Sequence, residues 1–187
     1  MAQKIGRYRR WEDAHLSLFG KLLLIRALQD MGQPASLLHQ MQYTDYDRPQ
    51  LPLPGLDFNI THSGPLVACA IASDRKIGID VEEARPIDFE DFRNIWRPDE
   101  WAAITAPNAG YGTFYRLWTS KEAVMKADGR GMSLPLEDIM VGDEGIAKVK
   151  SDSWYLRAVD LLPGVPAHIA SDKPIDKTPR LEKVTFL

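Results

Sequence analysis

The sequence has little cysteine, no long hydrophobic run and no dominant sign of charge. Cys69 is the only cysteine among 187 residues, so no disulfide can form within the chain. The longest apolar run, residues 66–72, is far shorter than the roughly 20 residues that span a bilayer. The 23 Lys and Arg residues against 26 Asp and Glu residues leave a net charge of -3. We therefore expect a cytoplasmic protein with neither a membrane nor a nucleic acid as its partner.

Motifs that carry several well-known chemistries are missing as well. The single cysteine gives no thiolate cluster, and the four histidines show no zinc spacing. There is no glycine-rich phosphate loop followed by Lys-Ser/Thr and no Gly-x-Ser-x-Gly elbow. The basic first ten residues precede no apolar stretch, so we predict no signal peptide. His168 is predicted to be a core or edge histidine. The tryptophans are predicted to serve packing: Trp11, Trp96, Trp101, Trp118 and Trp154.

The apolar pattern predicts two long helices, each followed by antiparallel strands. A stripe at helical spacing marks residues 11–30, and Gly20 within it is predicted to let another element pack closely. A second stripe marks residues 113–128, which Gly129 is predicted to end. The length fits one domain or two small halves. The predicted fold class is therefore α+β, built from two similar halves.

Strands are predicted after each of these helices. After the first, residues 58–60 and a buried strand at 66–71 are predicted to form a hairpin with a turn at 61–65, and residues 77–82 a further strand. The remaining predicted segments are loops at 44–55 and 106–112, short helical pieces at 89–104, and strands around 138–141, 146–149, 155–159 and 165–169.

The sharpest chemical motif is Gly-Ile-Asp-Val-Glu at residues 78–82. Because strand side chains alternate, Asp80 and Glu82 share one face of the predicted strand. Their Cα atoms then lie about 7 Å apart, so both carboxylates can converge on a hard cation such as Mg²⁺. The alternative is that both carboxylates face solvent along the edge of an amphipathic strand.

The second motif lies in the later predicted helix. Glu122 follows Trp118 by four residues and Phe114 by eight, so it shares their apolar face. A buried carboxylate needs a partner, and a metal is one such partner. Lys126 follows Glu122 by four residues, so a surface ion pair between the two is the alternative.

The third motif is the hydroxyl-rich segment at residues 58–64. With His62, this segment could hold a phosphate. The alternative is a hairpin turn in which Thr61 and Ser63 bind their own backbone. The basic start of the chain could likewise bind phosphate or form a solvated end; its residues are Lys4, Arg7, Arg9 and Arg10.

Together these segments resemble the Sfp-type 4′-phosphopantetheinyl transferases. The signature pair corresponds to residues 78–82 and 118–126, and the match covers nearly the whole chain. Further matching segments follow the same order, at residues 10–15, 46–49, 58–64 and 129–135. The resemblance implies a pseudo-dimer of two α+β halves, residues 1–75 and 76–187, with the active site in the cleft between them. Since the duplication is internal, we expect a monomer to suffice.

The resemblance also implies an activity. A family member transfers the 4′-phosphopantetheine group of coenzyme A to a serine of an apo acyl or peptidyl carrier protein, with Mg²⁺, and releases adenosine 3′,5′-bisphosphate. Asp80, Glu82 and Glu122 fall on the family's metal ligands, and Lys126 on the lysine that contacts the pyrophosphate. Glu122, Lys126 and Glu100 are the implied catalytic residues, and Asp80 and Lys126 are also implied in coenzyme A binding.

Other positions fall on the grip for coenzyme A. The residues implied at its 3′-phosphate are Lys4, Ser17, Arg48, Thr61 and His62, and those beside the adenine are Tyr46 and Pro49. Arg48 stands where lysine is common, which keeps the charge but changes its geometry. Thr61 stands where serine is common. Asp47 adds a negative charge near the nucleotide.

Three points leave alternatives open. Family members usually carry a further segment before the one that matches Lys4, so the chain could be a truncated relative that binds coenzyme A or a carrier without turnover. A Mg²⁺ phosphohydrolase acting on nucleotides fits the carboxylates but not the register of the other motifs. Residues 89–96 hold four large apolar side chains that either dock a carrier helix or pack the second half: Phe89, Phe92, Ile95 and Trp96.

Overall fold

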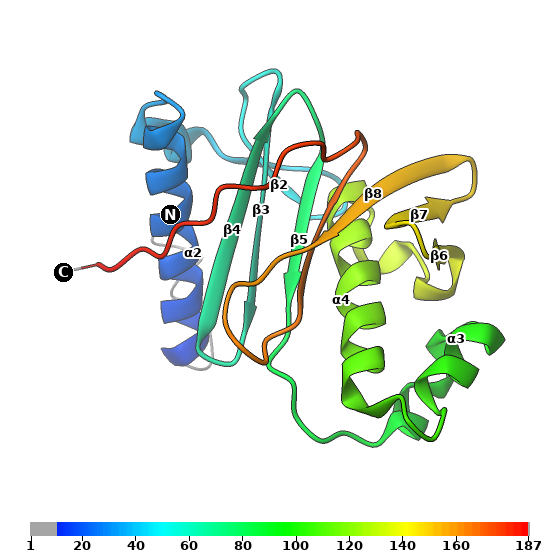
Figure 1. Cartoon of the computed structure of the whole chain (residues 1–187). Coiled ribbons are helices and arrows are strands. Elements are labelled where there is room, and N and C mark those ends of the chain that lie inside the picture. Colours follow the sequence, from blue (N-terminus) through cyan, green and yellow to red (C-terminus); the bar gives the residue numbers. More distant parts are fainter. Residues whose placement is uncertain (1–10, 187) are drawn as a thin grey trace.

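Two long helices, α2 (Trp11–Asp30) and α4 (Gly110–Asp128), each lie against an antiparallel sheet in the computed structural model, which describes residues 11–186. In Figure 1 the strands β3, β4 and β5 stand between α2 on the left and α4 on the right. The first helix has the predicted bounds, and the second begins three residues earlier than predicted. The predicted α+β class, with helices packed on antiparallel sheets, is confirmed.

The first sheet is a hairpin of β3 (Leu56–Ser63) and β4 (Leu66–Ser73). The helix α2 packs on it closely at Gly20, where an added Cβ would lie 2.7 Å from Cγ2 of Ile60. The prediction for Gly20 is therefore confirmed. The hydrophobic core between the helix and the hairpin includes Leu24 and Leu28 of α2, together with Leu38, Leu51 and Phe58.

Two expectations for this hairpin were wrong. The turn consists of Gly64 and Pro65 alone, so Thr61, His62 and Ser63 belong to β3 and not to a turn. A two-residue connection lets the ladder of backbone hydrogen bonds continue to the end of both strands. The strand β4 is also mostly half-buried instead of buried, because it is one of only two strands in its sheet.

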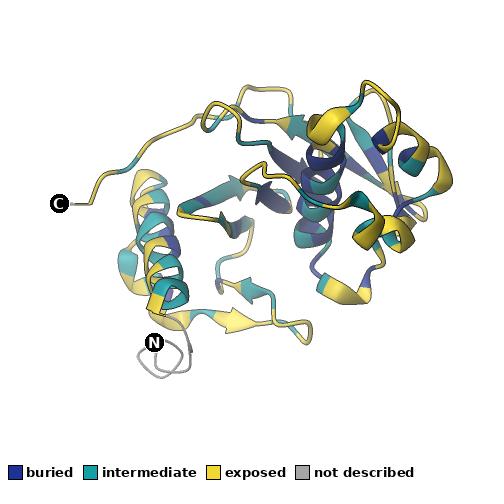
Figure 2. Cartoon of the chain, turned by 90° about the horizontal axis from the view of Figure 1, so that it is seen from below, coloured by how far each residue is buried: buried dark blue, intermediate teal, exposed yellow. Residues whose placement is uncertain are grey.

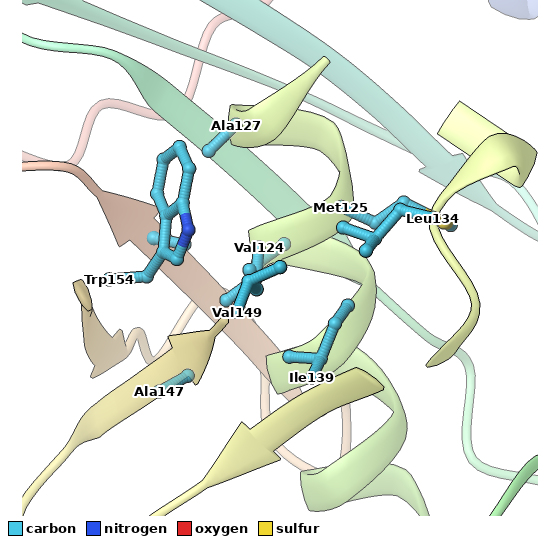
Figure 3. Close-up of a cluster of buried hydrophobic side chains, with 10 residues drawn as sticks. Val124, Met125, Ala127, Leu134, Ile139, Ala147, Val149 and Trp154 are labelled. Atoms are coloured by element: carbon cyan, nitrogen blue, oxygen red, sulfur yellow. The ribbon is translucent and has the colours of Figure 1, made fainter. Parts of the chain in front are cut away.

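The second sheet has five antiparallel strands in the order β5-β9-β8-β7-β6. Its strands are β5 (Ile77–Val81), β6 (Ile139–Val141), β7 (Ile146–Val149), β8 (Asp152–Ala158) and β9 (Ala167–Ser171). All lie within a few residues of their predicted positions. Figure 3 shows the core between this sheet and α4, where Val124 lies beside Val149, Ile139 and Trp154. Figure 2 shows buried residues gathered in α4 and its sheet, whereas most residues of α2 are half-buried or exposed.

Short elements connect the long ones. They are η1 (Ala35–Gln40), β1 (Gln42–Tyr43), β2 (Pro49–Gln50), η2 (Phe89–Ile95), α3 (Pro98–Ile104), η3 (Gly131–Ser133) and η4 (Leu136–Asp138). The predicted loop at 44–55 thus contains the second strand of a small β1-β2 pair. The loop predicted at 106–112 ends at residue 109, where α4 begins.

An aromatic cluster joins η2 to α4. Phe89, Phe92 and Trp96 each lie with ring centroids 5.3 to 5.4 Å from that of Phe114. Their contacts favour packing of the second half over docking of a carrier helix. The prediction that Trp11 serves packing was wrong. Trp11 is the first residue of α2 and is 70% exposed. Among the rings of the described residues, it contacts only that of His15, edge to face.

Three further observations complete the fold. The segment after β9 returns to α2, where Glu182 pairs with Arg26 at 2.8 Å and Phe186 contacts Phe19 (Figure 1). His168, on β9, is buried as predicted. Within residues 11–186, none of the helices combines the length and apolar character needed to cross a membrane.

The contact between β5 and α4 gives a first testable prediction. An added Cβ at Gly78 would overlap the carbonyl oxygen of Ala123 and lie 2.5 Å from the amide nitrogen of Ala127. Both are backbone atoms that cannot turn aside, so we expect Gly78→Ala to lower the free energy of unfolding by about 3 kcal/mol. Chemical denaturation measures this change.

The matched control is Gly112→Ala. Gly112 lies in the first turns of α4, with no neighbouring atom within 4 Å of an added Cβ. Alanine there should raise stability by up to about 1 kcal/mol through helix propensity. Equal effects of the two substitutions would contradict the close approach of α4 to β5.

Candidate functional site

A row of side chains from β3 meets the edge of β5 that is not paired with β9. The amide of Ile77 donates to Oδ2 of Asp57 at 2.9 Å, and the amide of Ile79 donates to Oδ1 of Asn59 at 3.0 Å. Alternate residues of a strand share a face, which explains why two positions of β3 reach β5 together. These side chains thus satisfy two backbone donors for which β9 offers no acceptor.

The same row continues to Thr61, which binds Asp80. The Thr61 hydroxyl donates to Oδ1 of Asp80 at 3.2 Å, and the Lys126 ammonium donates both to that carboxylate and, at 3.1 Å, to the Thr61 hydroxyl. Asp80 is 3% exposed, because β3 and α4 both cover β5. The alternative in which Asp80 faces solvent is therefore wrong. Burial raises the pKa of Asp80, and the charge of Lys126 opposes that rise.

Glu82 is held from two sides. Ser63 is the last residue of the β3 row, and its hydroxyl donates to Oε2 of Glu82 at 2.8 Å. The Trp118 indole on α4 donates to Oε1 of Glu82 at 3.2 Å. Burial raises the pKa of Glu82, and the negative charge of Asp80 adds to the rise. The two hydrogen bonds fix the orientation of this carboxylate between β3 and α4.

Glu122 completes the group from α4. Burial raises the pKa of Glu122 to about 7, with further increases from the charges of Asp80 and Glu82 and a decrease from Lys126. The ammonium of Lys126 forms its ion pair with Asp80 on β5, instead of the surface pair with Glu122 that was the alternative. Three carboxylates and one ammonium therefore form one partly buried cluster, which we call the β5–α4 charge cluster.

The chemistry of this cluster fits a cation. Oδ2 of Asp80 is buried and has no hydrogen-bond partner among the described residues. A divalent cation would supply that partner and would offset the repulsion between the three carboxylates. As the side chains stand, no three carboxylate, imidazole or thiol groups in the described part of the chain already surround a metal position.

Glu100 lies in a different environment. Its Oε2 accepts from the Lys121 ammonium at 2.5 Å and from the amide of Arg97 at 3.1 Å. The Lys121 side chain is 0% exposed, donates also to the carbonyl of Leu136 at 2.9 Å, and lies over the ring of Trp96. Burial lowers the pKa of Lys121. Glu100 thus joins α3 to α4, and its acid–base role stays a prediction.

The predicted coenzyme A residues lie on α2, around β2 and on β3, apart from Asp80 and Lys126 in the β5–α4 charge cluster. Thr61 lies beside the β5–α4 charge cluster, and His62, next to it on β3, is exposed. Ser17 accepts a hydrogen bond from Lys21 within α2. Tyr46 is exposed, and Pro49 begins β2. Lys4 lies outside the described residues, as do the other basic residues of the start.

A cavity of about 680 Å³ lies near the beginning of β3 and the end of α4. Tyr46 and Arg48 line it, together with Lys76 and Arg130. Arg48 is bound there to Asp57 through two hydrogen bonds of 2.7 and 2.9 Å. The residues that the sequence analysis missed, Asp57 and Lys121, are both charged groups at half-buried or buried positions of regular elements.

Comparison with known proteins gives one consistent family. Residues 76–158 match the model of the 4′-phosphopantetheinyl transferase superfamily. The chain is similar to 4′-phosphopantetheinyl transferase Sfp of Bacillus subtilis (strain 168), with 32% identity over 181 residues, covering 92% of this chain and 80% of that protein. A 4′-phosphopantetheinyl transferase of Bacillus subtilis is 36% identical over 144 residues, covering 74% of this chain and 63% of that protein.

A relative from another organism shows a similar degree of identity. The L-aminoadipate-semialdehyde dehydrogenase-phosphopantetheinyl transferase of Schizosaccharomyces pombe is 33% identical over 159 residues, covering 74% of this chain and 61% of that protein.

The pair of Glu100 and Lys121 gives a second prediction. Lys121→Met should lower the free energy of unfolding by about 3 to 5 kcal/mol, because it leaves the Glu100 carboxylate buried without its counterion. The double variant Lys121→Met/Glu100→Met should be more stable than Lys121→Met alone. Denaturant unfolding of the three proteins tests this. Simple addition of the two single effects, with Glu100→Met measured separately, would contradict the coupling.

Proposed function

The chain belongs to the 4′-phosphopantetheinyl transferase superfamily, and we propose that it transfers the 4′-phosphopantetheine group of coenzyme A to a serine of an apo acyl or peptidyl carrier protein. The products would be the holo carrier protein and adenosine 3′,5′-bisphosphate. The observation that carries the proposal is the β5–α4 charge cluster. It gathers carboxylates and an ammonium. The family resemblance implies these residues as the metal ligands and as the lysine that contacts the pyrophosphate.

We assign the metal to Asp80, Glu82 and Glu122. The unpartnered Oδ2 of Asp80 and the mutual repulsion of the carboxylates support a divalent cation, and oxygen ligands favour Mg²⁺. When bound, such a cation would neutralise charge on the pyrophosphate of coenzyme A. Ser63 and Trp118 would keep Glu82 turned toward the cluster through their two hydrogen bonds.

The chain's own residues have distinct roles in the proposed transfer. The serine oxygen of the carrier forms a bond to the β-phosphorus, and the bond from that phosphorus to the bridging oxygen breaks. Glu122 accepts the proton of the serine, and the Lys126 ammonium stabilises the charge left on the departing phosphate. Glu100 is the second candidate for the proton, but its ion pair with Lys121 favours Glu122 for this role.

Coenzyme A would extend from this cluster toward the first sheet. We assign its 3′-phosphate to Thr61 and His62, together with Lys4 and Ser17. Its adenine would lie against the loop of Tyr46 and Pro49, beside the cavity described above. The family resemblance also implies Arg48 at the phosphate.

The site would lie in the cleft between two halves, residues 1–75 and 76–187. The row of β3 side chains that meets β5 supports this division, because it crosses from one proposed half to the other. In each half, one long helix packs on an antiparallel sheet, as a pseudo-dimer would have it. One chain would then hold a whole site, so we propose that the protein acts as a monomer.

The transfer itself gives the third prediction. With Mg²⁺ and coenzyme A, the protein should add about 340 Da to an apo carrier protein, the mass of the transferred group. Mass spectrometry of several apo carriers measures this. Asp80→Ala and Glu122→Ala should each lower the rate at least about a hundredfold, whereas Asp143→Ala, an exposed acid in the β6–β7 turn, should leave it unchanged. Binding of coenzyme A without any mass shift would support a non-catalytic relative instead.

Removal of divalent metal gives the fourth prediction. A chelator should abolish the mass shift, and added Mg²⁺ should restore it. Calorimetric titration with Mn²⁺ should show one site in the wild-type protein that is lost in Asp80→Asn and retained in Asp143→Asn. Full transfer activity after exhaustive chelation would refute the assignment of the metal.

A further inference from the structure

The guanidinium of Arg48 is held by Asp57. Nη1 of Arg48 donates to Oδ1 of Asp57 at 2.9 Å, and Nη2 donates to Oδ2 at 2.7 Å. Only 9% of the Arg48 side chain and 17% of the Asp57 side chain are exposed. A bidentate pair fixes the plane of the guanidinium as well as its position. Arg48 is therefore a rigid group and not a mobile surface cation.

Two further hydrogen bonds of Arg48 reach the second sheet and α4. Nε donates to the carbonyl oxygen of Lys126 at 2.9 Å, and Nη2 donates to the carbonyl oxygen of Ile77 at 3.1 Å. Lys126 lies in the last turn of α4, where carbonyl groups have no partner within the helix. A cation near a helix C-terminus is also favoured by the helix dipole. Arg48 thus caps α4 from a different part of the chain.

The packing at the end of α4 depends on the same side chain. An added Cβ at Gly129 would lie 2.8 Å from Cδ of Arg48, so the chain leaves the helix directly over the Arg48 stem. Gly129 has a φ of 91°, which favours glycine. One turn back from this end, Lys126 directs its ammonium to Asp80 and Thr61. Arg48 therefore contacts the backbone of the residue whose side chain enters the charge cluster.

The donors of Arg48 are nearly all committed. A guanidinium has five N–H groups, and four of them point to the acceptors on Asp57, Lys126 and Ile77. Its charge is balanced by Asp57 in a place that is largely shielded from water. A phosphate ligand needs free donors and net positive charge, and Arg48 offers little of either.

We propose that Arg48, oriented by Asp57, is a positioning residue that holds the end of α4 and so places Lys126, and that it is not a ligand of the 3′-phosphate of coenzyme A. This inference rests on the proposed transferase function for its kinetic consequences. It gives Asp57 a role that the family resemblance did not imply. It also separates this chain from relatives with lysine at the position of Arg48, because an ammonium cannot form the same fork.

The variant Arg48→Lys distinguishes the two roles. Its ammonium would keep a positive charge that can bind phosphate, but the bidentate pair and the Nε hydrogen bond would be lost. The variant Asp57→Asn distinguishes them in the opposite sense, because it frees the charge of Arg48 while it weakens the support of α4. The matched control is Arg26→Lys, which changes an exposed ion pair with Asp30 and Glu182.

The experiment measures kcat and KM for coenzyme A and for 3′-dephospho-coenzyme A, together with Tm. Arg48→Lys and Asp57→Asn should each lower kcat roughly tenfold with both substrates, because a small displacement of a group at the reacting centre costs that much. The ratio of the two KM values should stay at its wild-type level. Arg26→Lys should change neither kcat nor the ratio of the two KM values.

Two results would overturn the proposal, and a third would separate it from the proposed function. Wild-type kcat in Arg48→Lys, with a lower KM for coenzyme A alone in Asp57→Asn, would make Arg48 a phosphate ligand. A lower Tm with unchanged kcat would make it a merely structural residue. Absence of transfer by the wild-type protein would refute the proposed function. The capping role of Arg48 would then be judged on Tm, and an unchanged Tm in both variants would refute that role. If Arg48→Lys does not fold, Asp57→Asn decides alone.

Discussion

The structure depends on one row of side chains, Asp57, Asn59, Thr61 and Ser63, that projects from β3 onto the edge of β5. Two members accept hydrogen bonds from the β5 backbone, where a neighbouring strand would otherwise do so. The other two bind carboxylates at the far end of the same edge. The same contact joins the two sheets and orients the acidic side chains. The candidate site therefore lies at the interface between the two sheets.

The second element of the site is α4, which is positioned at several points along its length. Gly78 lets the helix backbone approach β5 without an intervening side chain. The buried ion pair of Lys121 with Glu100 connects the middle of the helix to α3, and Arg48 caps its end. These contacts fix the position of α4, which has to hold Glu122 close to other negative charges. If the helix could shift, repulsion would let the carboxylates separate.

Local patterns in the sequence predicted much of this, and long-range contacts account for what they missed. Alternation along a strand was enough to put Asp80 and Glu82 together, and helical spacing was enough to put Glu122 on an inward face. No local pattern indicates that Lys126 binds Asp80, or that Arg48 binds Asp57, since these pairings depend on how the two sheets meet. The hairpin turn was misplaced because Thr61 and Ser63 look like turn residues, although their hydroxyls bind β5 side chains.

We propose that β3, β5 and α4 together form the site at which coenzyme A and a divalent cation meet. The most direct test is a crystal structure with coenzyme A and Mn²⁺, in which anomalous scattering locates the metal independently. We expect one metal peak bound by Asp80, Glu82 and Glu122, with the pyrophosphate of coenzyme A next to Lys126. A metal peak or a coenzyme A molecule bound elsewhere on the protein, with these side chains unchanged, would contradict it.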